Sequence, residues 1–414
     1  MTLARQGFPR AEATVEPDPG AVAPLVSIVI PCLDEAETVG DVVGEAHQAL
    51  VAARLPGEVI VADNGSGDGS PALARANGAR VVEATARGYG NALAAGIAAA
   101  RGRWVLIGDA DGSYDFGELP RFLPPLQGGA DLVMGCRLPA GGGRILPGAM
   151  PWTHRWIGNP ALSGLGRLFF AVPIHDFHCG LRAFRRDALL ALNLQCPGME
   201  YASEMVVRAR LAGLRLAEVP VTLRPDRRSR PPHLRSWRDG WRHLRFMLLF
   251  SPRWLFLIPG LLLASLSFAA FLRLLAGPLR VGEVTLDIGA LILASAGFVA
   301  GVQTVLIGML AKATAVALGI ANPTSVLTRL QPHRPVGLGL VGAAILLLVG
   351  LAYATGALLH WRKVGFGDLP PHESVRMVVP AVTAAAIGVQ LACFGFAIAI
   401  LQFGRELRLK RAQP

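Results

Sequence analysis

Two aspartates that are separated by one residue, Asp109 and Asp111, are the strongest candidates for chemistry in this sequence. They follow the apolar run Trp104–Gly108, which has the composition of a buried strand. In an extended segment, residues i and i+2 point to the same side, so both carboxylates can face one site. Such a pair suits Mg²⁺ or Mn²⁺, which also takes diphosphate oxygens and neutralises the charge on a departing nucleoside diphosphate. An exposed loop is the commoner explanation of an isolated Asp-x-Asp, and the position after a strand favours the metal site.

A second acidic segment, which contains Asp34 and Glu35, closes the β-branched run Val26–Ile30. We expect this run to be the first strand and to end at Pro31. Asp34 or Glu35 has the hydrogen-bonding capacity to hold a ribose hydroxyl. The structural alternative is that they cap the following helix or interact with its dipole, and the two roles are compatible.

A glycine-rich loop, Asp63–Gly69, follows the apolar run Glu58–Ala62. Its glycines allow a tight loop with exposed backbone, and Asp63 can accept a hydrogen bond from a base or ribose donor. A plain turn between strand and helix, capped by Asp68 or Ser70, is the alternative. Ligands of open α/β sheets bind beyond the carboxyl ends of the strands, so the shared position of these acidic loops is a first indication of function.

The elements that position these loops alternate between strand and helix from Val26 to Val221. Continuous apolar runs separated by helices predict an α/β fold with a mostly parallel, Rossmann-like sheet that is covered on both faces. The expected strands are Val26–Ile30, Glu58–Ala62, Ala79–Glu83 and Trp104–Gly108, and the expected helices are Thr38–Ala53 and Asn91–Ala100.

A basic segment, Arg224–Arg245, holds eight arginines and no lysine. Within it, Leu234–Phe250 has helical periodicity. Trp237, Trp241, Leu244 and Leu248 form one face, and Arg235, Arg238, Arg242 and Arg245 occupy another side. A basic helix with a tryptophan-bearing apolar face predicts a helix that lies in the membrane interface. An ordinary surface helix packed on the domain is the alternative.

Four apolar segments follow, and each can cross a hydrocarbon core, which takes roughly 20 residues. They are about Trp254–Leu275, Ile288–Leu310, Val336–Leu359 and Met377–Phe403. Four spans place both termini on one side, together with the basic stretch before Trp254, the Lys312–Arg334 connection and the Arg405–Arg411 tail. The positive-inside rule therefore predicts a multi-pass protein of the cell (plasma) membrane with the soluble domain and both termini in the cytoplasm.

The composition agrees with a membrane protein. Of 414 residues, 52% are hydrophobic and 17% are charged, and 40 Lys and Arg against 29 Asp and Glu give a net charge of +11. A basic excess can serve nucleic acid, anionic lipid or a phosphorylated substrate, and without an RNA- or DNA-reading motif we expect no nucleic acid partner. Five scattered cysteines without metal-ligand or disulfide spacing fit a reducing compartment. The segment Met1–Pro24 lacks an apolar signal-peptide core.

Taken jointly, these segments resemble the family-2 glycosyltransferases with the GT-A fold, and in particular the dolichyl- or polyprenyl-phosphate sugar (mannose or glucose) synthases. Several motifs occur in the family's order within Val26–Arg245, which makes the resemblance specific. They are Pro31-Cys-Leu-Asp-Glu35, Asp63-Asn-Gly-Ser-Gly-Asp-Gly69, Arg87-Gly-Tyr-Gly-Asn-Ala92, Asp109-Ala-Asp-Gly-Ser-Tyr-Asp115, Met134-Gly-Cys-Arg137 and Asp176-Phe-His-Cys-Gly-Leu-Arg182.

The resemblance implies roles for individual residues. The nucleotide-sugar would contact Pro31, Asp34, Glu35, Asp63 and Asp109, and the metal would bind Asp109 and Asp111. Arg137 would bind a phosphate of the donor or the acceptor. The acceptor phosphate would bind Arg182, Arg227 and Arg230. Guanidinium groups match phosphate oxygens in geometry, although attraction to anionic lipid headgroups explains Arg227 and Arg230 equally well.

Two departures from the family pattern affect these assignments. The family's Arg-x-x-Gly-x-Ser-Lys segment before the membrane reads Asp-Arg-Arg-Ser-Arg-Pro-Pro at residues 226–232, which leaves the ligand of the acceptor phosphate open. Ser113 stands where a Gln often follows the second metal Asp, so the metal ligation can differ.

The implied reaction moves a sugar from a UDP- or GDP-sugar to a polyprenyl phosphate at the cytoplasmic membrane face, with inversion at the anomeric carbon. A phosphate acceptor explains the lack of an obvious base, because its second pKa of about 6 leaves it anionic at neutral pH. A processive polysaccharide synthase is one alternative, but Trp152–Trp156 lacks the Gln of the Gln-x-x-Arg-Trp segment. A transporter or flippase with a degenerate transferase domain is another, and the intact aspartate pair argues against it.

The predicted organisation has five parts. They are a disordered N-terminal segment (1–24), a GT-A glycosyltransferase domain (25–232), a basic interfacial helix (233–252), a four-helix transmembrane domain (253–404) and a basic cytoplasmic tail (405–414). Related enzymes can be homo-oligomers, and the sequence leaves the oligomeric state open.

Overall fold

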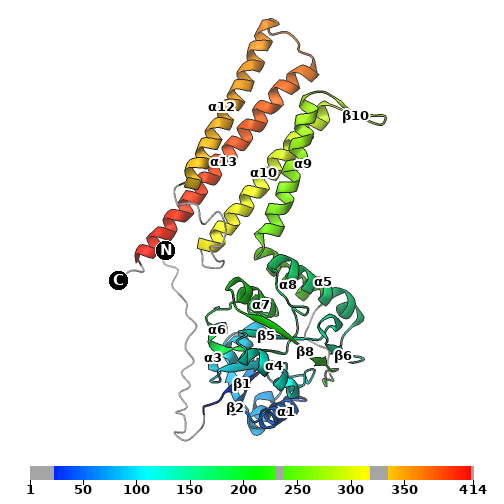
Figure 1. The fold of residues 1–414 in the computed structure, drawn as a ribbon, viewed down its shortest axis with the longest axis vertical. Coiled ribbons are helices and arrows are strands. Elements are labelled where there is room, and N and C mark those ends of the chain that lie inside the picture. The colour runs from blue at the N-terminus through cyan, green and yellow to red at the C-terminus, as the bar shows by residue number, and fades with distance from the viewer. Residues whose placement is uncertain (1–22, 230–235, 318–333, 412–414) are drawn as a thin grey trace. The chain divides into compact units, whose positions relative to one another are not determined.

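The computed structural model describes residues 23–229, 236–317 and 334–411. The chain divides into two compact units (Figure 1). The first consists of Met1–Ser163, Pro173–Met205 and Leu214–Leu234, and the second of Gly164–Val172, Val206–Gly213 and Arg235–Pro414. The expected N-terminal segment, 1–24, lies almost entirely outside the described residues.

The first unit is built on a seven-stranded sheet with the order β3-β2-β1-β4-β7-β5-β8. All neighbouring pairs are parallel except those made by β7, which is antiparallel to both β4 and β5. This arrangement confirms the mostly parallel α/β sheet. The strands are β1 (Val26–Cys32), β2 (Gly57–Asp63), β3 (Arg80–Glu83), β4 (Trp104–Ile107), β5 (Leu132–Cys136), β7 (Arg182–Arg185) and β8 (Leu216–Pro220).

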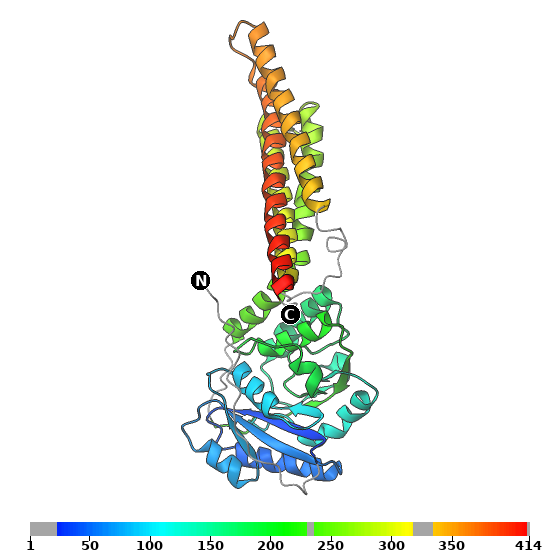
Figure 2. The same cartoon turned by 90° about the vertical axis from the view of Figure 1, so that its left-hand side faces the viewer.

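Helices cover both faces of this sheet, as Figure 2 also shows. Ile28 and Ile30 of β1 share one hydrophobic core with the buried face of α1. On the opposite face α3 approaches so closely that a Cβ on its Gly96 would lie 2.4 Å from Cγ1 of Val29. Both faces of β1 are therefore buried, which explains its uninterrupted apolar sequence. The helices that lie wholly in this unit are α1 (Val39–Ala52), α2 (Ser70–Ala76), α3 (Tyr89–Ala99), α4 (Leu119–Gln127) and α6 (Arg186–Leu190), whereas α5 (Asn159–Phe170) and α7 (Tyr201–Leu211) belong partly to each unit.

The first strand does not end at Pro31, as the sequence predicted, but continues to Cys32. Pro31 pairs with Ala62 of β2, whereas the pairing of β1 with β4 stops at Val29. A proline is excluded from a strand mainly because it lacks an N–H for the neighbouring strand. Beyond Val29, β4 provides no partner for that N–H, so proline is tolerated.

The second unit contains four helices that are long and apolar enough to cross a membrane, which confirms the expected spans. They are Arg253–Leu275 (which includes α9, Ile258–Leu275), Ile288–Ala317 (α10), Gly339–Lys363 (in α12, Arg334–Lys363) and Pro371–Gly404 (in α13, Pro371–Arg411). Their contacts use small residues, since a Cβ on Gly301 of α10 would lie 2.4 Å from the backbone N of Ala264 in α9. A hydrogen bond of 2.6 Å between Ser295 and Thr383 joins α10 to α13.

Candidate active site

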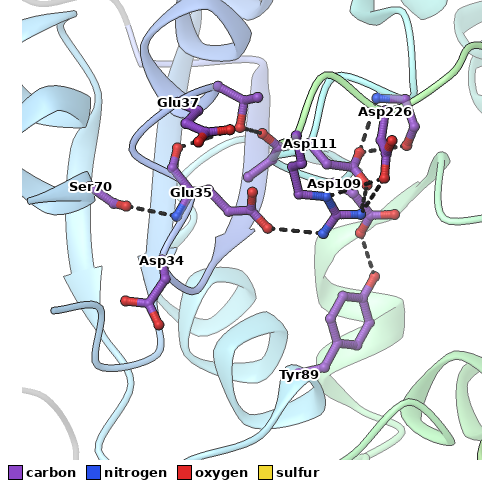
Figure 3. A network of polar contacts seen from close by, with 12 residues as sticks. Asp34, Glu35, Glu37, Ser70, Tyr89, Asp109, Asp111 and Asp226 are labelled. Carbon is purple, nitrogen blue, oxygen red and sulfur yellow. Dashed lines mark hydrogen bonds and ion pairs between the residues drawn. The ribbon is translucent and has the colours of Figure 1, made fainter. Parts of the chain in front are cut away.

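The loops that follow β1 and β2 are joined by hydrogen bonds at the carboxyl edge of the sheet. The backbone N of Asp34 donates to Oγ of Ser66 (2.9 Å), and the backbone N of Glu35 donates to Oγ of Ser70 (2.8 Å; Figure 3). In return, the backbone N of Gly67 donates to Oδ1 of Asp34 (2.8 Å). Asp34 adopts a positive φ of 55°, a conformation that aspartate tolerates better than most residues. The two acidic loops therefore form one rigid rim.

The carboxylate of Asp63 closes its own loop. Its Oδ2 accepts from the backbone N of Gly65 (3.0 Å) and of Ser66 (3.2 Å), and the side chain is buried. The turn that the sequence offered as an alternative is thus present, since Oδ1 of Asp68 also accepts from the backbone N of Ser70 (3.0 Å). The predicted contact of Asp63 with a base or ribose stays a prediction.

Asp109 and Asp111 follow β4 and lie together in the close view (Figure 3). Between them, the carbonyl of Ala110 accepts from Oγ1 of the buried Thr38 (2.7 Å), which fixes the loop against the start of α1. Oδ1 of Asp109 accepts from the hydroxyl of Tyr89 (2.9 Å). Oδ1 of Asp111 accepts from Oγ (2.6 Å) and N (3.0 Å) of Ser113. Ser113 therefore holds the second aspartate through its side chain.

The pKa of Asp109 is raised from 3.8 to about 6, chiefly by burial and next by the negative charge of Asp111. The hydrogen bond from Tyr89 and the charges of Arg182 and Arg137 act in the opposite direction. A carboxylate that is kept in an unfavourable environment beside a second one is typical of a functional site rather than of a structural ion pair.

This shift predicts a gain in stability for the Asp109→Asn variant of the full-length protein without metal. The folded-state pKa lies above the unfolded value, so stability from this group is present below about pH 4 and is lost as the pH rises through about 6. Asparagine cannot ionise, and the variant should therefore melt several degrees above wild type at pH 7.5, where each kcal/mol is worth about 2–4 °C. At pH 4 the two should melt together. Differential scanning fluorimetry in detergent with EDTA measures this, with the exposed Asp187→Asn as control; an equal gain at both pH values would contradict the cause.

Arg228 is the site residue that the sequence analysis missed. Its Nη2 lies 2.7 Å from Oδ2 of Asp111 and 3.2 Å from Oδ2 of Asp226, and its Nη1 lies 3.1 Å from Oε1 of Glu35. In Figure 3, dashed lines mark these contacts to the labelled carboxylates of Glu35, Asp111 and Asp226. The side chain is only 11% exposed. The sequence did place an arginine cluster here, but it pointed to Arg227 and Arg230.

Arg227 lies beside the site without touching the aspartate side chains. Its Nη2 is 2.6 Å from Oε1 of Glu45 on α1, and its backbone N donates to the carbonyl of Asp111 (3.0 Å). The guanidinium is partly exposed, so it is available to a ligand. Arg230 lies outside the described residues.

Arg137 is buried in a two-pronged ion pair rather than open to solvent. Its Nε and Nη2 donate to Oδ2 (2.7 Å) and Oδ1 (2.9 Å) of Asp176, and its Nη1 donates to the hydroxyl of Tyr114 (3.3 Å). Burial disfavours the charge, but Asp176 outweighs it and raises the pKa of Arg137. Arg137 is close enough to influence Asp109, and only its Nη1 edge is left for a phosphate.

Arg182 is also placed differently from the expectation of a phosphate ligand. It is 1% exposed, and it donates to the carbonyls of Cys179 (Nη2, 2.5 Å) and Ala202 (Nη1, 2.9 Å). Burial lowers its pKa. Backbone carbonyls inside the domain bind the guanidinium, so it is not available to a phosphate at the open edge of the sheet. Its charge still lowers the pKa of Asp109.

The donor set fits a hard divalent cation that shares its ligands with a substrate. Within residues 23–229, 236–317 and 334–411, no three His, Cys, Asp or Glu side chains come together as a complete metal cage. Mg²⁺ is usually bound by one or two carboxylates plus substrate phosphates and water, which is what Asp109 and Asp111 offer. Arg228 places a positive charge on Oδ2 of Asp111, which shows that this oxygen attracts a cation.

The basic helix is seen as α8 (Ser236–Leu249), within the second unit. Trp237 is 93% and Trp241 60% exposed, and the predicted position of this face in the membrane interface stays a prediction. Trp152, Trp156 and Ile157 are also exposed apolar side chains, and they lie in the first unit.

A mostly parallel sheet with an aspartate pair after a central strand, in a chain with four membrane-length helices among its described residues, defines a multi-pass membrane protein with an α/β domain whose candidate site lies beyond the carboxyl ends of the strands. Two family models match this chain: Glycosyl transferase family 2 over residues 27–192, and Glycosyltransferase family 2 C-terminal transmembrane region over residues 309–402.

Curated relatives agree with the family models. The chain is 36% identical over 384 residues to the low-salt glycan biosynthesis hexosyltransferase Agl6 of Haloferax volcanii, covering 92% of this chain and 90% of the relative. It is 32% identical to a dolichyl-phosphate hexose transferase of the same organism, over 48% of this chain and 82% of the relative. It is 33% identical to the polyprenol monophosphomannose synthase of Mycolicibacterium smegmatis, over 50% and 80%. The chain belongs to glycosyltransferase family 2, and the expected GT-A-like fold and enzyme class are confirmed.

Proposed function

We propose that this glycosyltransferase moves a hexose from a UDP- or GDP-sugar to a polyprenyl phosphate at the cytoplasmic face of the cell membrane, giving a lipid-linked monosaccharide with inverted anomeric configuration. The observation that carries the proposal is the aspartate pair at the carboxyl edge of the sheet, in a chain that also has four membrane-length helices. The names of two relatives, dolichyl-phosphate hexose transferase and polyprenol monophosphomannose synthase, support the acceptor class.

The residues at the site act in this reaction by positioning and by charge. The rim formed by Asp34, Glu35 and Asp63 would bind the nucleoside, since these loops are rigid and rich in acceptors. Asp109 and Asp111 would hold Mg²⁺ or Mn²⁺, which supplies charge neutralisation for the leaving diphosphate. Tyr89 and Ser113 fix the orientation of these carboxylates.

The acceptor would need no general base from the protein. A phosphate monoester is anionic near neutral pH, with a second pKa of about 6. The partly exposed Arg227 and the Nη1 edge of Arg137 would bind its oxygens, because guanidinium groups pair well with phosphate. The exposed tryptophans of α8 would rest in the headgroup layer, where the phosphate of a prenyl lipid also lies.

Transfer to lipid is tested with the purified full-length protein in detergent. It is incubated with polyprenyl phosphate, MgCl₂ or MnCl₂, and a panel of radiolabelled UDP- and GDP-hexoses, and label in the organic phase is identified by mass spectrometry. We expect one donor to give a labelled polyprenyl-phosphate hexose, and free polyprenol, which lacks the phosphate, to give none. If no donor labels the lipid, or if label appears only in a water-soluble polymer, the proposed acceptor is wrong.

A further inference from the structure

The guanidinium of Arg228 is the feature of the site that the proposed reaction does not use. It bridges Asp111 (2.7 Å), Glu35 (3.1 Å) and Asp226 (3.2 Å), which come from three different loops. Burial disfavours its charge, but Asp111 and Glu35 outweigh burial and raise the pKa of Arg228. This bridge places one positive charge among the carboxylates at the carboxyl edge of the sheet.

The backbone around Arg228 is held in place by contacts on both sides. The backbone N of Arg224 donates to the carbonyl of Ser113 (2.9 Å), and that of Arg227 donates to the carbonyl of Asp111 (3.0 Å). On the other side, Ser229 donates from N (2.8 Å) and Oγ (2.5 Å) to the carboxylate of Glu37. The segment Arg224–Ser229 thus crosses the rim and holds Arg228 over Asp111.

A guanidinium and a divalent cation on the same oxygen of Asp111 would repel each other, because both are positively charged. Oδ1 of Asp111 is already occupied by Ser113, and Oδ2 is the oxygen that Arg228 holds. A metal ion that binds Asp109 and Asp111 through these oxygens would therefore meet Arg228 as a competitor of the same charge.

We propose that Arg228 and the metal ion are alternative partners of Asp111, and that Arg228 exchanges its carboxylates for phosphate oxygens when a nucleoside diphosphate arrives with the metal. This inference rests on the proposed function, because it assumes a metal-bound diphosphate donor. A phosphate gives the displaced guanidinium a new partner of opposite charge. Metal alone would bind weakly against Arg228, and metal with the nucleotide would bind tightly. In both states Arg228 then has partners of opposite charge.

The exchange is tested by titrating Mn²⁺ into the full-length protein and following free Mn²⁺ by electron paramagnetic resonance. Without nucleotide, Arg228→Ala should bind Mn²⁺ about tenfold more tightly than wild type, a coupling of ordinary size for linked sites. With saturating UDP or GDP the advantage of the variant should disappear or reverse. Arg228→Lys keeps the charge without the fork and should lie between the two.

Two further variants locate the effect. Arg75→Ala removes the same charge from an exposed pair with Glu83 and should leave Mn²⁺ binding unchanged. Asp111→Asn should remove the tight Mn²⁺ binding that wild type shows with nucleotide and that Arg228→Ala shows without it. Equal or weaker Mn²⁺ binding by Arg228→Ala, or no binding by either protein, would overturn the competition. An advantage that nucleotide leaves unchanged would overturn the exchange for phosphate.

The outcome is independent of the transfer assay. If Mn²⁺ binding follows the expected pattern but no sugar reaches the lipid, only the proposed acceptor fails. If the lipid is labelled but Arg228 has no effect on Mn²⁺ binding, the proposed function stands and the exchange does not.

Discussion

The Asp111→Ala variant is expected to transfer sugar to polyprenyl phosphate about a hundredfold to a thousandfold more slowly than wild type, on the scale of removing one pre-organised group that stabilises a developing charge. Asp111 lies beside Asp109, and its negative charge contributes to the raised pKa of Asp109. Hydrogen bonds from Ser113 hold the carboxylate of Asp111 in a fixed orientation. Its loss removes one of the two protein ligands that the proposed metal would have. The rate is measured as labelled lipid formed in a single turnover at saturating donor, so that weaker donor binding does not contribute.

The matched control is Asp187→Ala, which removes an aspartate that is 88% exposed and far from the aspartate pair in sequence. It should transfer sugar at the wild-type rate. Asp111→Ala should also melt within a few degrees of wild type, because Arg228 keeps Glu35 and Asp226 as partners of opposite charge. A variant that is folded and retains a tenth or more of the wild-type rate would show that Asp111 is not a metal ligand in the reaction. Continued lipid transport by a transfer-dead variant would instead favour the transporter alternative.

The architecture of this protein was predictable from its sequence because the hydrophobic pattern carries it. Four spans of membrane length and the buried parallel strands are continuous apolar runs, and neither requires knowledge of long-range contacts. The end of β1 was not predictable in this way. Whether Pro31 is tolerated depends on where β4 stops pairing, and that is a property of the sheet rather than of the segment.

The acidic half of the site was predictable for a different reason. Acidic loops that follow parallel strands must meet at one edge of the sheet, so Glu35 and Asp111 were expected to lie together, and Arg228 now joins them. The basic half was not predictable. Residues 224–230 contain four arginines of identical chemistry, and only the backbone contacts of Arg224–Ser229 select Arg228 to face the carboxylates.

The burial of Arg137 and Arg182 was also hidden from sequence reasoning. Arginine is rarely buried, so an arginine beside a binding motif is naturally assigned to a ligand. Here both side chains meet protein acceptors, Asp176 for Arg137 and backbone carbonyls for Arg182. The charges of both arginines still lower the pKa of Asp109. The sequence motif does not reveal this effect, because it depends on how the side chains are placed in the fold.

The ion pair of Arg137 and Asp176 should be the most costly single contact to break in the first unit. Their side chains are 9% and 0% exposed. Removing one partner of a buried pair costs about 3–5 kcal/mol because the other charge is left without compensation. At about 2–4 °C for each kcal/mol, Arg137→Ala should lower the melting temperature by roughly 10 °C or more. Scanning fluorimetry of the full-length protein in detergent measures the shift.

A double-variant cycle separates the ion pair from the packing of each side chain. Asp176→Ala should be destabilising on a similar scale, but the double variant Arg137→Ala with Asp176→Ala should lose less than the sum of the two by more than about 1 kcal/mol, because neither charge is then left alone. Additive losses would show that the two residues are held independently. Arg137→Lys adds the functional distinction: it keeps a cation beside Asp109 but loses the fork on Asp176. If the lysine variant at a temperature well below its melting point transfers sugar normally, Arg137 serves the fold. If its KM for polyprenyl phosphate rises while kcat is kept, the Nη1 edge of Arg137, which also donates to Tyr114, binds the acceptor.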